Sequence, residues 1–107
     1  MNLPNSILEL VKAQNNFDSV AYANCFAETA TVLDEGSAYS GTIEIEKWIA
    51  EANKKYKAVM KPIGYTESGS SSILTAEVSG TFEGSPLILN YHFEIIDGLI
   101  QSLEVTA

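Results

Sequence analysis

The sequence predicts an α+β fold in which three N-terminal helices pack on a curved, mostly antiparallel sheet. In the first half of the chain apolar residues recur every three to four positions, as on one face of a helix, and from about Ala58 onward they alternate, as in half-buried strands. Asp97-Gly98, between two apolar runs, is a strong hairpin signal. Helices followed by a meander of strands indicate a sheet covered by helices on one face. At 107 residues we expect one domain, spanning residues 1–107.

Two helices are expected before the first strand. Apolar residues at helical spacing behind Pro4 predict a helix from about Pro4 to Gln14, and its inner face is made by Leu3, Ile7, Leu10 and Val11. Asp18 is expected to cap a short second helix that ends near Phe26.

The first strand is expected from Ala30 to Asp34. Strand alternation puts Ala30, Val32 and Asp34 on one face, so if the two apolar residues face the core, the Asp34 carboxylate is aimed at the same interior. A glycine-bounded loop from Glu35 to Gly41, which carries Tyr39, is expected to follow.

Thr42 is expected to cap a third helix, whose broad apolar face is made by Ile45, Trp48, Ile49, Ala52 and Tyr56. Behind it, Ala58 to Glu67 reads as a strand, and because it contains Pro62 and Gly64 we expect an edge or bulged strand.

Three more strands complete the predicted sheet, over Ser72–Phe82, Pro86–Ile96 and Leu99–Thr106. In the second of these, alternation places Tyr91 and Phe93 on the inner face and His92 on the outer face. The only histidine is therefore expected at an interface or in solvent rather than as a catalytic base.

Composition excludes several function classes. The net charge is −8, there is no arginine, and five of the six lysines lie between Lys47 and Lys61, so nucleic acid is not an expected partner. The single Cys25, with no cationic neighbour in sequence, fits a buried residue in a reducing compartment. No segment reads as a signal peptide or membrane span, so we expect a cytoplasmic protein without membrane contact. One histidine and one cysteine give little basis for a metal site, and no cofactor is expected.

The order of these elements resembles the nuclear transport factor 2-like superfamily, in particular its SnoaL-like (polyketide cyclase and ketosteroid isomerase-like) members. The run FAETATVLDEGSAYSG, from Phe26 to Gly41, is similar to the family pattern F-A-x-D-A-x-x-x-D, and the resemblance covers essentially the whole chain. It implies a cystatin-like cone in which a strongly curved sheet wraps round the helices and leaves a mostly apolar cavity.

The resemblance also implies a site. In isomerase-like members the aspartate at the end of the first strand is a general base in the cavity, and Asp34 occupies the matching place. The family's donors to the enolate oxygen are a helix-one tyrosine and a protonated acid on a later strand, but here those places hold Leu10 and Tyr91. Tyr91 is therefore the candidate donor, and the pocket is expected to be lined by Tyr39, Trp48, Phe26, Val32 and Phe93.

Two classes of function stay open. In the first, a small, largely apolar ligand with one polar group binds beside Asp34, and any reaction is a proton transfer of the isomerase, cyclase or dehydratase type. In the second, the cavity is filled, Asp34 caps the following loop, and the domain serves assembly. In either case we expect a homodimer through the outer sheet face, which carries Ile88, Asn90, His92 and Ile96.

Overall fold

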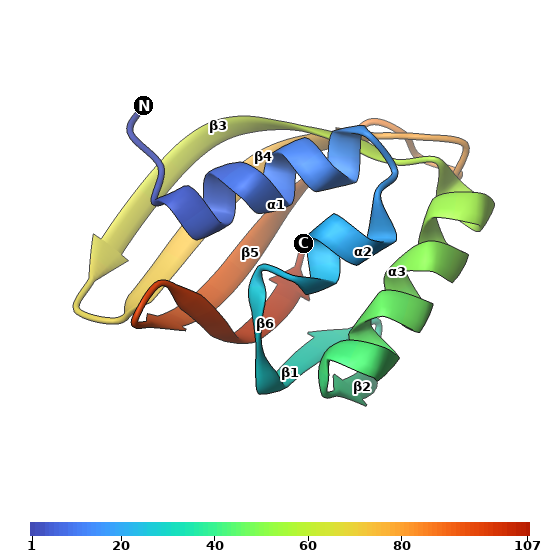
Figure 1. Cartoon of the computed structure of the whole chain (residues 1–107). Helices are drawn as coiled ribbons and strands as arrows, with labels where there is room; N and C mark the ends of the chain where they lie inside the picture. Colours follow the sequence, from blue (N-terminus) through green and yellow to red (C-terminus); the bar gives the residue numbers. More distant parts are fainter.

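A computed structural model describes all 107 residues and contains three helices and one six-stranded sheet. The helices are α1 (Asn5–Asn15), α2 (Ser19–Ala23) and α3 (Thr42–Tyr56). The strands are β1 (Phe26–Asp34), β2 (Ser37–Ser40), β3 (Val59–Ser68), β4 (Ser71–Ser79), β5 (Leu87–Ile96) and β6 (Leu99–Thr106). All three helices lie on one face of the bent sheet (Figure 1). The expected α+β cone is confirmed.

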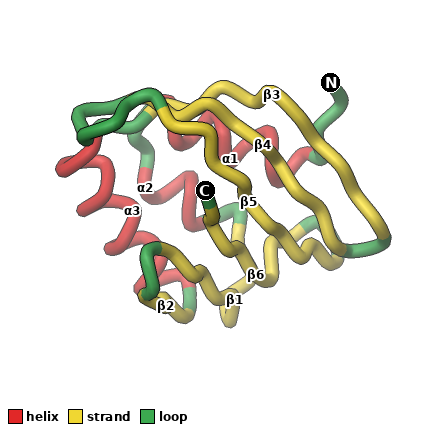
Figure 2. The backbone as a smooth tube through the Cα atoms, turned by 180° about the vertical axis from the view of Figure 1, so that it is seen from behind, coloured by secondary structure: helices red, strands yellow, loops and turns green.

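The sheet runs in the order β2-β1-β6-β5-β4-β3, and only the β1–β6 pair is parallel. Consecutive strands from β3 to β6 pair antiparallel, as a meander. The predicted Asp97-Gly98 hairpin joins β5 to β6, and both residues have positive φ (52° and 79°), which a tight hairpin turn of the primed type requires. Seen from behind, the face of the sheet opposite the helices is uncovered (Figure 2).

The core lies between the helices and the inner face of the sheet. It comprises 19 buried residues, among them Leu10 and Ile45 from the helices and Leu74, Tyr91 and Leu103 from the strands. Alternating burial along β4 and β5 matches the predicted inner faces. No helix combines the length and the hydropathy needed to cross a bilayer.

β3 is the edge strand that its proline and glycine predicted, with a register shift between Pro62 and Gly64. Its exposed edge is partly closed by α1, because the Asn15 side chain accepts from the Met60 N–H (2.8 Å) and donates to the Met60 carbonyl (3.0 Å). The Asn15 side-chain amide thus satisfies the two backbone groups of Met60 that a neighbouring strand would otherwise pair with.

The boundary between α2 and β1 was predicted wrongly. The helix ends at Ala23 and the strand begins at Phe26, four residues before the predicted start. Phe26 lies opposite Ile100 of β6, and the Ile100 N–H donates to the Cys25 carbonyl (3.0 Å). Pairing with the last strand of the chain, which local sequence does not reveal, extends β1 at the expense of the helix.

The segment between β1 and α3 is not a plain loop. Glu35 and Gly36, with φ of 51° and 79°, turn the chain back so that Ser37–Ser40 pairs with β1 as β2. Thr42 is the first helical residue rather than the cap, since Gly41 holds the cap position without a side-chain hydrogen bond. Glu44 accepts from the Ser40 N–H (2.9 Å) and thereby ties the helix start to β2.

β4 ends at Ser79 and not at Phe82 as predicted. The chain leaves the sheet because Thr81 caps the end of α3: its N–H donates to the Tyr56 carbonyl (2.7 Å) and its hydroxyl to the Lys55 and Tyr56 carbonyls (both 3.1 Å). A β carbon on Gly80 would overlap the same Tyr56 oxygen, so this crossing requires glycine.

Candidate functional site

Asp34 ends β1 on the face that the alternation predicted. Ala30 and Val32, on the same face, have no exposed surface, and Asp34 itself is half-buried. Burial raises the pKa of the Asp34 carboxyl above its ordinary value, and the Glu35 charge raises it further. The Trp48 indole N–H and the Glu35 backbone N–H donate toward the carboxylate and lower its pKa in part. Asp34 is thus a partly desolvated acid with polar neighbours.

Three aromatic rings, one each from α2, β2 and α3, pack on one another near the end of β1. Tyr39, opposite Val32 in the strand register, stacks on Trp48 of α3 with ring centres 5.4 Å apart. Tyr22 of α2 packs against Trp48 edge-on, with ring centres 6.1 Å apart. Such arrangements are the favoured geometries of aromatic pairs, so the three rings form a preorganised wall.

The charge of Asp34 raises the pKa of two buried tyrosines, Tyr91 and Tyr22. Tyr91, 8% exposed, has its pKa raised by burial and then by the Asp34 charge. Tyr22, 2% exposed, has its pKa raised by burial, by Tyr91 and by Asp34. Unlike the Tyr65 hydroxyl, which donates to Glu67, the hydroxyls of Tyr22 and Tyr91 make no hydrogen bond within the chain. Both phenols therefore stay neutral and keep a proton to donate.

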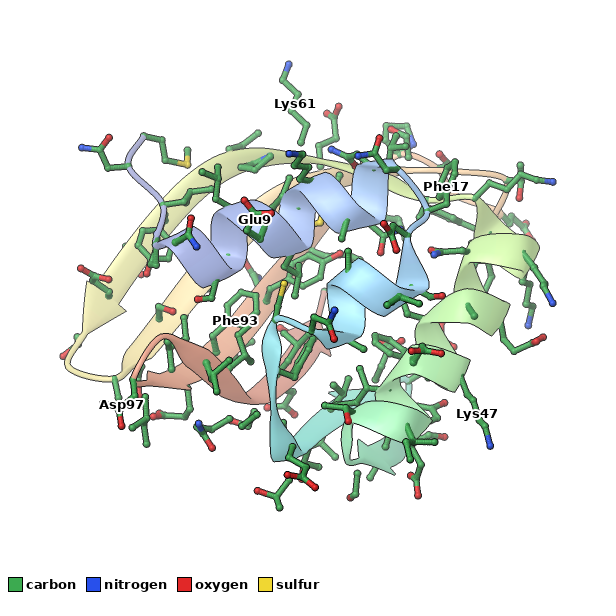
Figure 3. The ribbon with its side chains drawn as sticks, in the orientation of Figure 1. Glu9, Phe17, Lys47, Lys61, Phe93 and Asp97 are labelled. Atoms are coloured by element: carbon green, nitrogen blue, oxygen red, sulfur yellow. The ribbon has the colours of Figure 1, made fainter.

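The other predicted pocket residues lie deeper. Val32, Phe26 and Phe93 are 0%, 3% and 2% exposed and belong to the core. The Phe93 side chain points from β5 into the layer between the sheet and the helices (Figure 3). Phe26 also touches the wall, with its ring centre 5.7 Å from that of Tyr22. These three residues are part of the buried apolar core.

Sequence reasoning missed Tyr22. The available signal was its place four residues after the capping Asp18, whose side chain accepts from the Ala21 N–H (3.0 Å) and fixes the start of α2. That position makes Tyr22 an inward residue of a helix, but only the packing of α2 on α3 brings it to Trp48.

His92 lies on the outer face, as alternation predicted, and its Nε2 is 2.9 Å from the Thr106 hydroxyl oxygen. It lines a hollow of about 360 Å³, which opens on the outer face of the sheet and not beside Asp34. Leu33, Ile73, Glu94, Ser102 and Glu104 also line it. The outer face thus holds a concave surface of its own, distinct from the residues round Asp34.

No family model matches the chain, and no curated protein matches it. Among solved structures, a candidate polyketide cyclase from Sinorhizobium meliloti is 36% identical, with a TM-score of 0.93 over 97% of this chain and 95% of that one. A hypothetical protein with a ketosteroid isomerase-like fold from Catenulispora acidiphila, in complex with trimethylamine, is 17% identical, with a TM-score of 0.89 over 99% and 87% of the two chains. A candidate polyketide cyclase from Xanthomonas campestris is 22% identical, with a TM-score of 0.80 over 94% and 85%.

Proposed function

The chain belongs to the nuclear transport factor 2-like superfamily as a SnoaL-like domain, and on that premise we propose that it binds a small organic carbonyl compound beside Asp34 and catalyses proton transfer on it. The observation that carries the proposal is the half-buried Asp34 carboxyl, whose pKa burial raises, together with the buried and neutral phenols of Tyr91 and Tyr22, whose pKa values its charge raises. A base and hydrogen-bond donors near one another are what enolisation requires.

In the proposed reaction the Asp34 carboxylate removes a proton from the carbon next to the carbonyl group. The C–H bond breaks, an O–H bond forms on Asp34, and the electron pair moves to the carbonyl oxygen, which becomes an enolate. Tyr91 donates a hydrogen bond to that oxygen and Tyr22 is placed to assist. Return of the proton from Asp34 to another carbon completes an isomerisation. Alternatively, the enolate carbon attacks a second carbonyl of the same molecule, a C–C bond closes the ring, and the alkoxide formed takes the proton from Asp34.

The environment favours this chemistry over hydrolysis by a charged nucleophile. Burial raises the pKa of Asp34 toward the range in which a carboxylate exchanges protons with carbon acids more readily. The surrounding Tyr39, Trp48 and Phe26 rings offer an apolar surface to the ligand body. The trimethylamine bound by the Catenulispora protein is a further support, because it places a small organic molecule on a domain of this fold.

Hydrogen–deuterium exchange tests the proposal without knowledge of the natural substrate. A panel of small ketones and 1,3-dicarbonyl compounds is incubated with the protein in D₂O, and loss of the α-proton signals is followed by NMR. Wild type is expected to accelerate exchange of at least one member. Asp34→Asn is expected to lower the rate by about 10²–10⁴-fold, the usual contribution of a general base.

Asp97→Asn is the matched control, because it removes one aspartate charge at a different place, the exposed β5–β6 turn (Figure 3). Tyr91→Phe, which removes one hydroxyl and keeps the ring, is expected to lower the rate while leaving the melting temperature close to that of wild type. If Asp34→Asn exchanges substrate as fast as Asp97→Asn does, Asp34 is not the base.

A second role, homodimerisation through the outer sheet face, is favoured by the hollow there and by the exposed apolar residues that flank it. Leu33, Ile73 and Ile88 are 45%, 38% and 49% exposed on this face. Pairing two copies would cover these side chains, in the way sheet faces are normally buried.

Sedimentation velocity tests this pairing. Ile73→Lys is expected to shift the protein from dimer to monomer, because it puts a charge in the hollow of this face. Ile43→Lys is the control, since Ile43 is 74% exposed on α3, away from the sheet. A wild-type protein that sediments as a monomer at high concentration would contradict the pairing but leave the proton-transfer proposal intact.

A further inference from the structure

Trp48 is the single tryptophan of the chain, and it lies on the side of α3 that packs against β1 and β2. It is partly buried and packs against the hydrophobic core. An indole ring can fill such a place with its apolar surface alone, but it also carries one N–H group, which usually finds a polar partner when the ring is covered. The partner of this N–H decides what else Trp48 does.

The register of β1 and β2 brings that partner, Asp34, to the indole. Tyr39 lies opposite Val32, so its side chain is on the same face of the sheet as Val32 and Asp34. Tyr39 stacks on Trp48, with ring centres 5.4 Å apart and ring planes inclined by 25°. The indole therefore lies beside the end of β1, where its N–H donates to the Asp34 carboxylate.

Trp48 has little freedom to turn away from this carboxylate. Besides the stacking with Tyr39, Tyr22 of α2 packs against the indole edge-on, with ring centres 6.1 Å apart. Both arrangements are favoured geometries of aromatic pairs. The Glu35 backbone N–H donates to the same carboxylate from the β1–β2 turn. Asp34 is thus held by two donors, one in its own turn and one on a helix.

We propose that Trp48 is the positioning residue of the base, and that its indole N–H holds the Asp34 carboxylate in one orientation toward the ligand. The proposal rests on the role of Asp34 in the proposed function. Tyr39 and Tyr22 act on the base through Trp48, because their rings fix the plane of the indole. An ionised carboxylate has about four acceptor positions, so two donors leave lone pairs free for the proton of the ligand.

The same hydrogen bond favours the ionised form of the base. Burial and then the Glu35 charge raise the pKa of the Asp34 carboxyl, whereas the indole N–H stabilises the carboxylate and lowers that pKa. Removal of the N–H should therefore raise the pKa of Asp34 further. Because a protonated carboxyl group cannot accept a proton, the pH range of proton transfer should move upward with this pKa.

NMR titration tests the contact without any substrate. The single indole gives one side-chain N–H signal in the ¹⁵N-labelled chain. This signal is expected to shift between about pH 3 and 8, with the midpoint of the Asp34 carboxyl signal measured by ¹³C NMR. In Asp34→Asn the shift of the indole signal should be lost.

Glu35→Gln is the matched control for this titration. The charged or titratable groups that interact with Asp34 are Glu35, Tyr22 and Tyr91, and Lys55 of α3 interacts with Glu35. Burial raises the pKa of both tyrosines, so they stay neutral over the titration. Glu35 is thus the other carboxyl to test, and in Glu35→Gln the indole shift should remain, with a lower midpoint because one neighbouring charge is gone.

An isosteric replacement separates hydrogen bonding from packing. Because Trp48 is the single tryptophan, incorporation of 3-benzothienylalanine in place of tryptophan alters this one side chain and puts sulfur where the N–H was. 5-Fluorotryptophan, which keeps the N–H, is the control. The isostere is expected to raise the pKa of Asp34 and to lower kcat in the exchange assay about tenfold or more, with little change in KM and a pH profile moved upward.

An indole signal that does not titrate, or that titrates equally in Asp34→Asn, would overturn the proposal. The same holds if the isostere and the 5-fluorotryptophan protein share one pKa for Asp34 and one kcat, even where wild type exchanges substrate and the proposed function stands. In the reverse case, no carbonyl compound exchanges but the indole follows Asp34; the proton-transfer function then fails, while Trp48 still positions this carboxylate.

Discussion

Replacing Gln14 with methionine isolates the hydrogen bonds that join the ends of the helices. Gln14 is 7% exposed, and its Nε2 donates to the Asn53 side chain (3.0 Å) and to the Ala58 carbonyl (2.7 Å). These bonds link α1 to the last turn of α3 and to the start of β3. Methionine has nearly the same length and volume, so Gln14→Met removes both donors and leaves little cavity.

The expected cost follows from those two bonds. A protein hydrogen bond contributes about 1 kcal/mol net, so losing two lowers the free energy of unfolding by about 2 kcal/mol. Ala58 is half-buried, so water can partly satisfy its carbonyl, which keeps the cost near this value rather than above it. At about 4–8 °C per kcal/mol for a domain near this size, the melting temperature should fall by roughly 8–16 °C.

Urea unfolding followed by circular dichroism, together with thermal melts, measures this change. Gln101→Met is the matched control, because Gln101 makes only a long bond to the Leu99 carbonyl (3.4 Å) and should shift stability by less than about 0.5 kcal/mol. A double-mutant cycle with Asn53→Ala should show a coupling of about 0.5–1 kcal/mol. If Gln14→Met melts no lower than Gln101→Met, the bonds to Asn53 and Ala58 do not stabilise the fold.

Three further predictions follow from single groups. Because burial raises the pKa of Asp34, its protonated form is the better accommodated one. Its contribution to the free energy of unfolding is therefore present at low pH and is lost as pH rises through the raised pKa. Urea titrations between about pH 3 and 7 should show that the free energy of unfolding of Asp34→Asn depends less on pH than that of wild type. Gly80→Ala should lower the free energy of unfolding by about 1–3 kcal/mol in the same assay, because a β carbon overlaps the Tyr56 carbonyl oxygen. Gly64→Ala is the control: its β carbon would lie 3.7 Å from the Thr75 side chain, so stability should change by less than about 1 kcal/mol. Equal costs for the two variants would contradict this reasoning. Burial raises the pKa of the Cys25 thiol to about 11, so iodoacetamide at pH 8 should modify it only in unfolding concentrations of urea, and rapid alkylation of the folded chain would refute the buried placement.

Local patterns predicted the sheet well where a strand and its partner are neighbours in sequence. β4 and β5 alternate, and Asp97-Gly98 supplies the turn to β6, so the inner faces of β4 and β5 and the last hairpin could be predicted from the sequence. The start of β1 and the whole of β2 were predicted wrongly, for two different reasons. Phe26 pairs with Ile100, far along the chain, and the Glu35–Gly36 turn is less typical than Asn-Gly or Asp-Gly.

The candidate site was predicted in part. Strand parity placed the half-buried Asp34 beside the core, and the same rule put Tyr91 inward. Tyr22 was not foreseen, because its distance to Trp48 depends on how α2 crosses α3.

The amino-acid sequence by itself determined the order of the helices and of every strand except β2, the inner faces of β4 and β5, and the position of an acid at the end of β1. These features depend on local periodicity and turn chemistry, which act over a few residues. Only the tertiary structure decided which groups meet: the packed rings of Tyr22, Tyr39 and Trp48, and the buried phenols of Tyr22 and Tyr91 whose pKa the Asp34 charge raises. The physical reason is that burial and electrostatic contact depend on distances between segments far apart in the chain, and local sequence does not encode these distances.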